Sequence, residues 1–329
     1  MYKQFYCLTK NPFEITPDPS FLFMSKRHNE ALATLYYGVR RRKGFVVLTG
    51  EVGTGKTLLI RSLLQLLKLG DVQYAYLFNS RLGPTEFLQY IAGDFRLPIS
   101  AKTKSELLLK LSSFVVSRFM KGLTTVLVVD EAHHLSEEVL EEIRLLTNLE
   151  TAEEKLLQIL LVGQPELDEK LDSINLRQLK QRIALRCHLC PLVLEEIEGY
   201  IRRRLLVAGN ANPDTLFPFD TVLEIHRHSR GIPRVINTLC ENALLYGYSR
   251  RASKITPDII EEVAMDFRLS IAHPTSLPDT VDSQSLRTVE DAAKTLLDLY
   301  ATLRQTQSGG AKLREVVRNV GVREDEPYI

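Results

Sequence analysis

The eight residues GEVGTGKT, at positions 50–57, are the stretch of the sequence best suited to chemistry. They follow the apolar run FVVLT and lead into a stretch of helical periodicity from Lys56 to Lys68. Glycines let backbone N–H groups turn towards an anion, and the following helix directs its positive end at the same point. The spacing G-x-x-x-x-G-K-[ST] between a strand and a helix therefore predicts a phosphate-binding loop.

Residues within this loop have distinct expected roles. Lys56 is expected to reach the β- and γ-phosphates of a nucleotide, and Thr57 is expected to hold Mg²⁺ through its hydroxyl. The residues predicted to bind the nucleotide are Gly50, Glu51, Val52, Gly53, Thr54, Gly55, Lys56 and Thr57.

Adjacent acidic residues, Asp130 and Glu131, follow the apolar run TVLVV. In an open α/β sheet the ligand lies at the carboxyl ends of the strands, and burying neighbouring acids is costly unless they are paired or metal-bound. We expect Asp130 to bind Mg²⁺ and Glu131 to orient the attacking water, which favours hydrolysis over transfer to another substrate. His133 and His134 suit a supporting or helix-capping role better than metal ligation.

Three further polar residues are candidates for the same site. Gln164 follows the apolar run LQILLVG and could bond the γ-phosphate or the water, or simply form a turn before Pro165. Arg182 follows Arg177 just before the last strand, where an arginine could enter a neighbouring subunit's site and stabilise transition-state charge. Arg234 opens a helix in the motif GIPR and could close onto the phosphates. A plain surface role is the alternative for both arginines.

The elements that must position these residues alternate along the chain. Apolar runs rich in β-branched residues lie at 45–49, 74–78, 125–130, 157–163 and 183–189. Helical stretches separate them at 56–68, 85–95, 105–121 and 137–149. Strands that are apolar throughout and alternate with helices predict an α/β fold, a three-layer arrangement in which helices flank a parallel five-stranded sheet.

The domain organisation follows from the same patterns. Helical stretches at 194–208, 219–228, 233–249 and 257–267 predict a small α-helical lid domain after the last strand. We therefore divide the chain into an aromatic-rich segment (1–43) that packs on the nucleotide-binding core, that core (44–190), the lid (191–268), and a linker with a partly helical tail (269–329). The aromatics of the first segment either fill a satellite core or line an adenine pocket.

Net charge, cysteine content and the length of apolar stretches limit the classes of protein that this sequence can represent. The net charge is +1, so no global field attracts nucleic acid, although basic runs at 40–43 and 202–204 allow local contacts with phosphates. Four cysteines are too few for a disulfide framework, and the lone pair Cys187 and Cys190 lacks the second pair of a zinc ribbon. No apolar stretch is long enough for a membrane span, and the N-terminus lacks a signal-peptide pattern. A cytoplasmic protein is expected, with membrane contact only through partners.

In this order the motifs resemble those of the AAA+ ATPases, and within them the ExeA or general secretion pathway protein A type, an ORC/TniB-like group of P-loop NTPases. The resemblance covers about residues 1–268 and rests on NPFEITPDP with the following helix, GEVGTGKT, VVDEAHHL, LLVGQPEL, LKQRI and GIPRVINTLCENAL. It implies Walker A at 50–57, Walker B at Asp130 with Glu131, sensor 1 at Gln164, an arginine finger at Arg182 and sensor 2 at Arg234. Gln164 departs from the more common Asn, Ser or Thr.

The resemblance also implies partners. We expect an ATP- and Mg²⁺-dependent ATPase that forms homo-oligomers and assembles or remodels a protein complex of an envelope secretion, pilus or polysaccharide-export system. Secretion proteins of this type continue into a membrane span and a peptidoglycan-binding domain, and the sequence shows neither, which argues against direct work in the envelope. An ATP-gated DNA-binding adaptor, as in transposition regulators, is the alternative. A small-molecule kinase is disfavoured because no acceptor pocket is evident.

Overall fold

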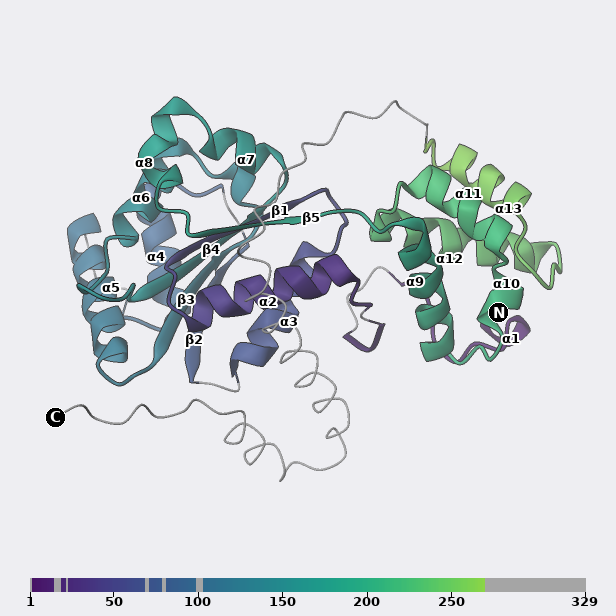
Figure 1. The fold of residues 1–329 in the computed structure, drawn as a ribbon, viewed down its shortest axis with the longest axis horizontal. Coiled ribbons are helices and arrows are strands. Elements are labelled where there is room, and N and C mark those ends of the chain that lie inside the picture. Colours follow the sequence, from purple (N-terminus) through teal and green to yellow (C-terminus); the bar gives the residue numbers. More distant parts are fainter. Residues whose placement is uncertain are drawn as a thin grey trace, which may run out of the picture. The chain divides into compact units, whose positions relative to one another are not determined.

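A computed structural model describes residues 2–14, 19–21, 23–68, 71–78, 81–98 and 103–269. Within these residues one five-stranded sheet forms, in the order β2-β3-β4-β1-β5, and all neighbouring strands are parallel (Figure 1). The strands are β1 (Phe45–Gly50), β2 (Val72–Leu77), β3 (Thr124–Val129), β4 (Leu157–Gly163) and β5 (Leu185–Leu189). The predicted α/β class with a parallel five-stranded sheet is confirmed.

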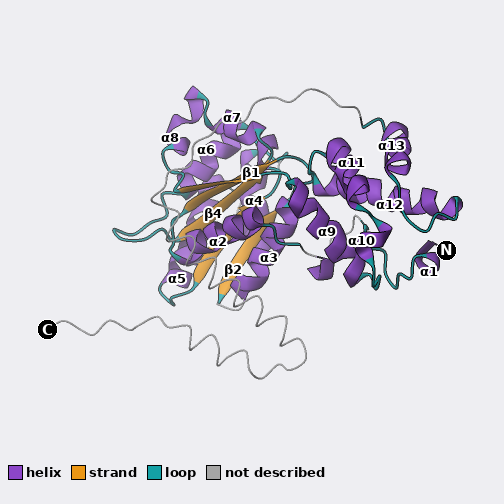
Figure 2. Cartoon of the chain, turned by 45° about the vertical axis from the view of Figure 1, so that its right-hand side comes forward, coloured by secondary structure: helices purple, strands orange, loops and turns teal. Residues whose placement is uncertain are grey.

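Helices cover both faces of the sheet (Figure 1 and Figure 2). The longer ones are α2 (Lys26–Arg40), α3 (Lys56–Lys68), α4 (Pro84–Asp94), α5 (Lys104–Phe119) and α6 (Glu137–Leu146), followed by the short α7 (Glu166–Leu171) and α8 (Arg177–Lys180). Phe45 and Val47 pack with α4, α5 and α6, whereas Val46 faces Gly38 of α2 on the other side. Because both faces are covered, β1 and β4 are buried along their whole length.

A second apolar core lies in the helical domain. Its helices are α9 (Leu194–Val207), α10 (Pro213–Leu216), α11 (Phe219–Ser229), α12 (Pro233–Ser249) and α13 (Pro257–Asp266). The helical region predicted after the last strand is therefore present, with an additional short helix at α10. No helix of the described ranges is long and apolar enough to cross a membrane.

The aromatic N-terminal segment divides between the two cores, which corrects the expectation that it packs as a whole on the nucleotide-binding core. Helix α1 (Tyr2–Phe5) joins the helical domain, where the Tyr2 hydroxyl donates to Glu241 Oε1 at 2.6 Å and the Tyr6 hydroxyl donates to the Ala252 carbonyl at 3.0 Å. Phe13 packs edge-on against Phe217 in the same core. Among the described residues of this segment, α2 packs on the sheet, against β5, β1 and β3.

Element ends shift by a few residues from the predicted ones. Helix α6 ends at Leu146, three residues before the predicted end, where the Thr147 hydroxyl donates to the Arg144 carbonyl at 2.6 Å. Strand β2 begins at Val72, two residues before the predicted start, because it pairs with β3 from Thr124 onward. The predicted linker and tail helix, from residue 270 on and including 289–303, lie outside the described residues.

Gly231 lies against the segment that joins β5 to α9, and substituting it should destabilise the fold. Its φ is +77°, and an added Cβ would lie 2.0 Å from the Leu192 carbonyl oxygen, while the Leu192 N–H donates to the Gly231 carbonyl at 2.9 Å. We expect Gly231→Ala to lower the free energy of unfolding, measured by chemical denaturation, by more than about 2 kcal/mol.

Gly122 provides the matched control for this substitution. Its φ is +70°, yet an added Cβ meets nothing within 4 Å. Gly122→Ala should therefore cost only the backbone strain of about 1–2 kcal/mol. Equal losses in the two variants would show that the approach of Gly231 to Leu192 does not matter to stability.

Candidate nucleotide-binding site

The loop between β1 and α3 has the backbone geometry of an anion cradle. Gly53 and Gly55 have φ values of +83° and +100°, which residues with side chains rarely adopt. The first N–H groups of α3, from Lys56 onward, have no partner within the helix and point out of its N-terminus. An added Cβ at Gly53 would lie 2.6 Å from Cβ of Arg234, so another chain segment already packs against this loop.

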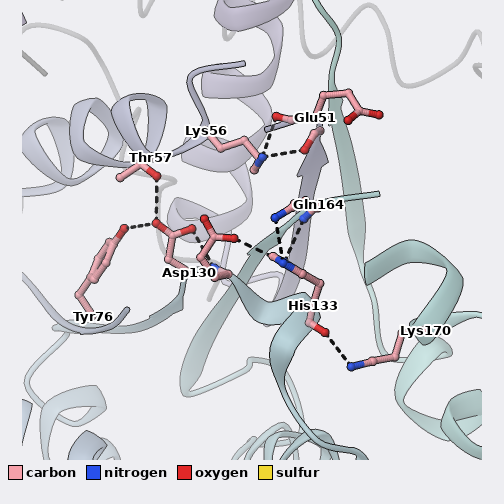
Figure 3. Close-up of polar contacts among 10 residues, drawn as sticks. Glu51, Lys56, Thr57, Tyr76, Asp130, His133, Gln164 and Lys170 are labelled. Carbon is pink, nitrogen blue, oxygen red and sulfur yellow. Dashed lines mark hydrogen bonds and ion pairs between the residues drawn. The ribbon is translucent and has the colours of Figure 1, made fainter. Parts of the chain in front are cut away.

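Lys56 lies inside the loop (Figure 3). Its Nζ donates to the Gly50 carbonyl at 2.6 Å and to the Glu51 carbonyl at 2.9 Å, and the residue is 6% exposed. Burial lowers the pKa of Lys56, and the acidic neighbours Glu131 and Asp130 oppose this shift. A lysine buried among backbone carbonyls and acidic side chains suits a residue retained for an anionic ligand.

The Asp130 carboxylate accepts three hydrogen bonds (Figure 3). Its Oδ2 accepts from the Thr57 hydroxyl at 3.1 Å and from the Tyr76 hydroxyl at 2.6 Å, and its Oδ1 accepts from the Glu131 N–H at 2.9 Å. The carboxylate is thus fixed beside Thr57 although it is only 5% exposed. A hydroxyl next to a carboxylate is the oxygen donor set that Mg²⁺ prefers, so these residues fit the predicted ion.

Protein sites for Mg²⁺ generally use one or two carboxylates, with the remaining positions filled by water and substrate phosphates. The Asp130 carboxylate beside the Thr57 hydroxyl matches that pattern.

Tyr76, which supplies the shortest of these hydrogen bonds, was not among the residues predicted from the sequence. It belongs to β2, and its pKa is raised, first by burial and then by Asp130. The position of Tyr76 near the end of a predicted strand could have suggested it as a site residue. The order of the strands cannot be predicted from the sequence pattern, and only the pairing of β2 with β3 brings Tyr76 beside Asp130.

Glu131, His133 and Gln164 form a second polar group next to the first. Glu131 has a left-handed backbone (φ +52°) where β3 leads into a short 3₁₀ turn, η2 (Ala132–His134), and its side chain is 46% exposed. His133 Nδ1 lies 3.5 Å from Glu131 Oε2, and its Nε2 lies 2.9 Å from Gln164 Nε2. A half-exposed glutamate with a left-handed backbone at a strand end is a candidate for contact with a ligand.

The two candidate arginines lie at opposite ends of the sheet. Arg234 donates its backbone N–H to the Gly53 carbonyl at 3.2 Å and so belongs to the loop's surroundings. Arg182 precedes β5, and the nearby Ala184 N–H donates to the carbonyl of Phe45, the first residue of β1. Because β1 runs from this edge to the phosphate-binding loop, Arg182 lies far from its own chain's loop.

A cavity beside the loop brings together residues from distant parts of the sequence. It is lined by Thr54 and Gly55 of the loop, Phe21 and Phe23 of the N-terminal segment, and Tyr200 of α9, among others. Phe23 packs edge-on against Tyr200, with ring centroids 5.8 Å apart. Phe13 thus fills a core, as one of the two predictions has it, and Phe23 lines this cavity.

The basic runs and the cysteine pair mostly have structural partners. Arg204 is buried under this cavity, where its Nε donates to the Pro12 carbonyl at 2.5 Å, and Arg202 lies 3.5 Å from Asp214. Cys187 is buried, and burial raises its pKa to about 12, while His188 faces the opposite, exposed side of β5 as predicted.

Comparisons with known proteins agree with this geometry. The sequence matches the AAA domain family over residues 39–171. The structure resembles the ORC2 protein of Aeropyrum pernix, solved as ADPNP–ADP complexes, with a TM-score of 0.57 and 17% identity over 78% of this chain and 71% of that one. It also resembles Cdc6p of Pyrobaculum aerophilum, with a TM-score of 0.59 and 19% identity over 78% and 70% of the two chains. The fold and the loop therefore define a P-loop NTPase of the AAA+ class.

A curated relative places the chain within that class. General secretion pathway protein A of Aeromonas hydrophila is 46% identical over 256 residues, which are 78% of this chain. The chain belongs to the AAA+ proteins of this type, as the sequence motifs predicted. It spans 46% of the length of that relative.

Proposed function

We propose that the protein binds ATP together with Mg²⁺ and hydrolyses it at the site described above. The observation that carries the proposal is the convergence of Lys56, Thr57, Asp130 and Glu131 at the carboxyl ends of β1 and β3. A buried ammonium, an oxygen pair suited to Mg²⁺ and a half-exposed carboxylate are the groups that phosphoanhydride hydrolysis needs.

Each residue of the site has a role in this reaction. The loop residues 50–57 bind the phosphates, chiefly through their backbone N–H groups and the Lys56 side chain. Thr57 and Asp130 would hold the ion, which neutralises developing charge when bound. Glu131 accepts a hydrogen bond from the attacking water and polarises it. Gln164 and Arg234 contact the γ-phosphate from β4 and from the start of α12, so closure of the helical domain would complete the site.

The cavity beside Thr54 and Gly55 is the proposed site of the adenine base. Its apolar walls include Phe21 and Phe23, and a flat aromatic base gains from contact with such side chains. The Arg204 guanidinium lies 5.0 Å from the centre of the Phe21 ring and holds that wall in place. The N-terminal segment would therefore select for the base while the loop binds the phosphates.

We further propose that the protein acts as a homo-oligomer in the cytoplasm and assembles or remodels a protein complex of an envelope export system. The position of Arg182, far from its own chain's loop, suits an arginine that completes the site of a neighbouring copy. The name of the curated relative supports a role in secretion, and the protein would meet the membrane through partners. The exposed residues Arg40, Arg41 and Lys43 favour the second candidate, an ATP-gated DNA-binding adaptor.

A complementation experiment tests whether Arg182 completes the nucleotide site of a neighbouring copy, which we call the shared site. Arg182→Ala should lower the ATPase rate per subunit at saturating ATP by about 100-fold or more while ATP binding persists. Lys56→Ala should be inactive because its own site cannot hold the phosphates. An equimolar mixture should regain activity, since a Lys56→Ala subunit can offer Arg182 to the intact site of its neighbour.

The dependence of the wild-type rate on protein concentration provides the independent check. The rate per subunit should rise with concentration as copies associate. A slow rate that is independent of concentration, unaffected by Arg182→Ala and not restored in mixtures would contradict the shared site. That outcome would favour the monomeric adaptor, whose binding to DNA should weaken steeply with salt.

A further inference from the structure

The ring of His133 lies beside Gln164, the residue that follows β4 (Figure 3). The His133 side chain is 8% exposed, and the ring of His134 lies against it with centroids 4.0 Å apart. Both ring nitrogens face Gln164, since Nδ1 is 3.4 Å from the Gln164 backbone nitrogen and Nε2 is 2.9 Å from its carboxamide. The contacts of this ring therefore depend on which nitrogen carries the proton.

Hydrogen-bond chemistry decides the tautomer. A backbone N–H can only donate, so Nδ1 of His133 must accept and carries no proton. The proton of the neutral ring then resides on Nε2, which becomes a donor and needs an acceptor at 2.9 Å. The carboxamide oxygen of Gln164 is that acceptor once the amide is turned by half a rotation, which exchanges its oxygen and nitrogen.

This orientation determines what Gln164 presents to the ligand. With its oxygen held by His133, the carboxamide has its NH₂ group left for the nucleotide. An NH₂ group donates to phosphate oxygens, whereas the opposite orientation would place an oxygen against them and repel them. We infer that His133 is a positioning residue that holds Gln164 as a hydrogen-bond donor towards the γ-phosphate. The inference rests on the proposed function, because it assumes that a nucleoside triphosphate occupies the site.

A neutral ring of this tautomer does not donate to Glu131. An unprotonated Nδ1 and the Glu131 Oε2, 3.5 Å apart, are both acceptors and do not bond each other. A protonated ring would instead donate to Glu131 and withdraw it from water. Burial is the first cause that lowers the pKa of His133, His134 and Lys56 lower it further, and Glu131 and Glu166 oppose them.

The other charged neighbour of His133 does not contact the ring. Lys170 of α7 donates to the backbone carbonyl of His133 at 2.7 Å, so it holds the turn in place. Because the lowered pKa keeps the ring neutral at pH 7, the arrangement in which Gln164 donates and the ring does not donate to Glu131 is the one present at that pH. Turnover by the wild type should fall only as the pH drops well below 6.5, the ordinary pKa of histidine.

A binding experiment on the full-length protein tests the inference without relying on turnover. Dissociation constants for ATPγS and for ADP are measured by displacement of a fluorescent ADP analogue, in wild type, His133→Leu and His133→Gln. Leucine removes the donor, so ATPγS should bind about five- to tenfold more weakly while ADP binding changes less than about twofold, because ADP lacks the γ-phosphate. Glutamine offers an amide donor near the position of Nε2 and should restore most of the ATPγS affinity.

A double variant makes the inference specific to Gln164. If His133 acts through Gln164, then His133→Leu should add little to the loss of ATPγS affinity already caused by Gln164→Ala. Losses that multiply, or an equal weakening of ATPγS and ADP, would overturn the inference. Failure of the proposed function is distinguishable, since a wild type without ATP turnover could still show this selective loss of ATPγS binding.

Discussion

Glu131→Gln should leave nucleotide binding intact and lower the turnover number by about 10²- to 10⁴-fold, the usual contribution of a positioned base. The carboxylate is half exposed at the end of β3, close to Lys56 and beside His133, while its own N–H is tied to Asp130. Glutamine keeps the size and the backbone contact but cannot polarise the attacking water. Steady-state ATPase rates and binding of a fluorescent ADP analogue measure the two effects separately.

Glu166→Gln is the matched control for this prediction. Glu166 is an exposed carboxylate at the start of α7, and its charge reaches both Lys56 and His133. The control removes a negative charge near the site without touching the proposed base, and its turnover should stay within about twofold of wild type. Full turnover in Glu131→Gln, or equal losses in the two variants, would show that Glu131 is not the base.

Lys56→Ala should weaken ATP binding by about 100-fold or more, which also accounts for its expected inactivity in the mixing experiment. Hydrogen bonds to charged groups contribute about 1.5–3 kcal/mol each, and the ammonium can make two of them to the phosphates. In the structure its Nζ is held by the carbonyls of Gly50 and Glu51, at the position where the loop closes around an anion. Isothermal titration with ATP in the presence of Mg²⁺ measures the loss.

Lys68→Ala controls for the removal of a lysine from the same helix. Lys68 is the last residue of α3, exposed and stacked over Tyr74, and it lies at the opposite end from the loop. Its substitution should leave the affinity for ATP unchanged within about twofold. If Lys56→Ala bound ATP as tightly as Lys68→Ala, the phosphate-binding role of the loop would have to be abandoned.

The sequence by itself determined the elements and the phosphate-binding loop. Helices α3 and α12 and strand β4 occupy the predicted residues, because their apolar periodicity and their glycine and proline boundaries are local signals. The predicted pair of Asp130 and Glu131 lies at the carboxyl end of a parallel strand, where such sheets place their ligands. These features depend on neighbours within a few residues, so a single sequence contains enough information to predict them.

Only the tertiary structure decided which distant side chains meet. Tyr76 reaches Asp130 because β2 pairs with β3, and His133 faces Gln164 because β3 pairs with β4. The parallel pairing of β1 with β5 places Arg182 at the edge of the sheet opposite its own loop, and the first aromatic residues pack in the core of the helical domain. Strand order and the burial of whole faces arise from contacts between residues far apart in the chain, and no local periodicity encodes them.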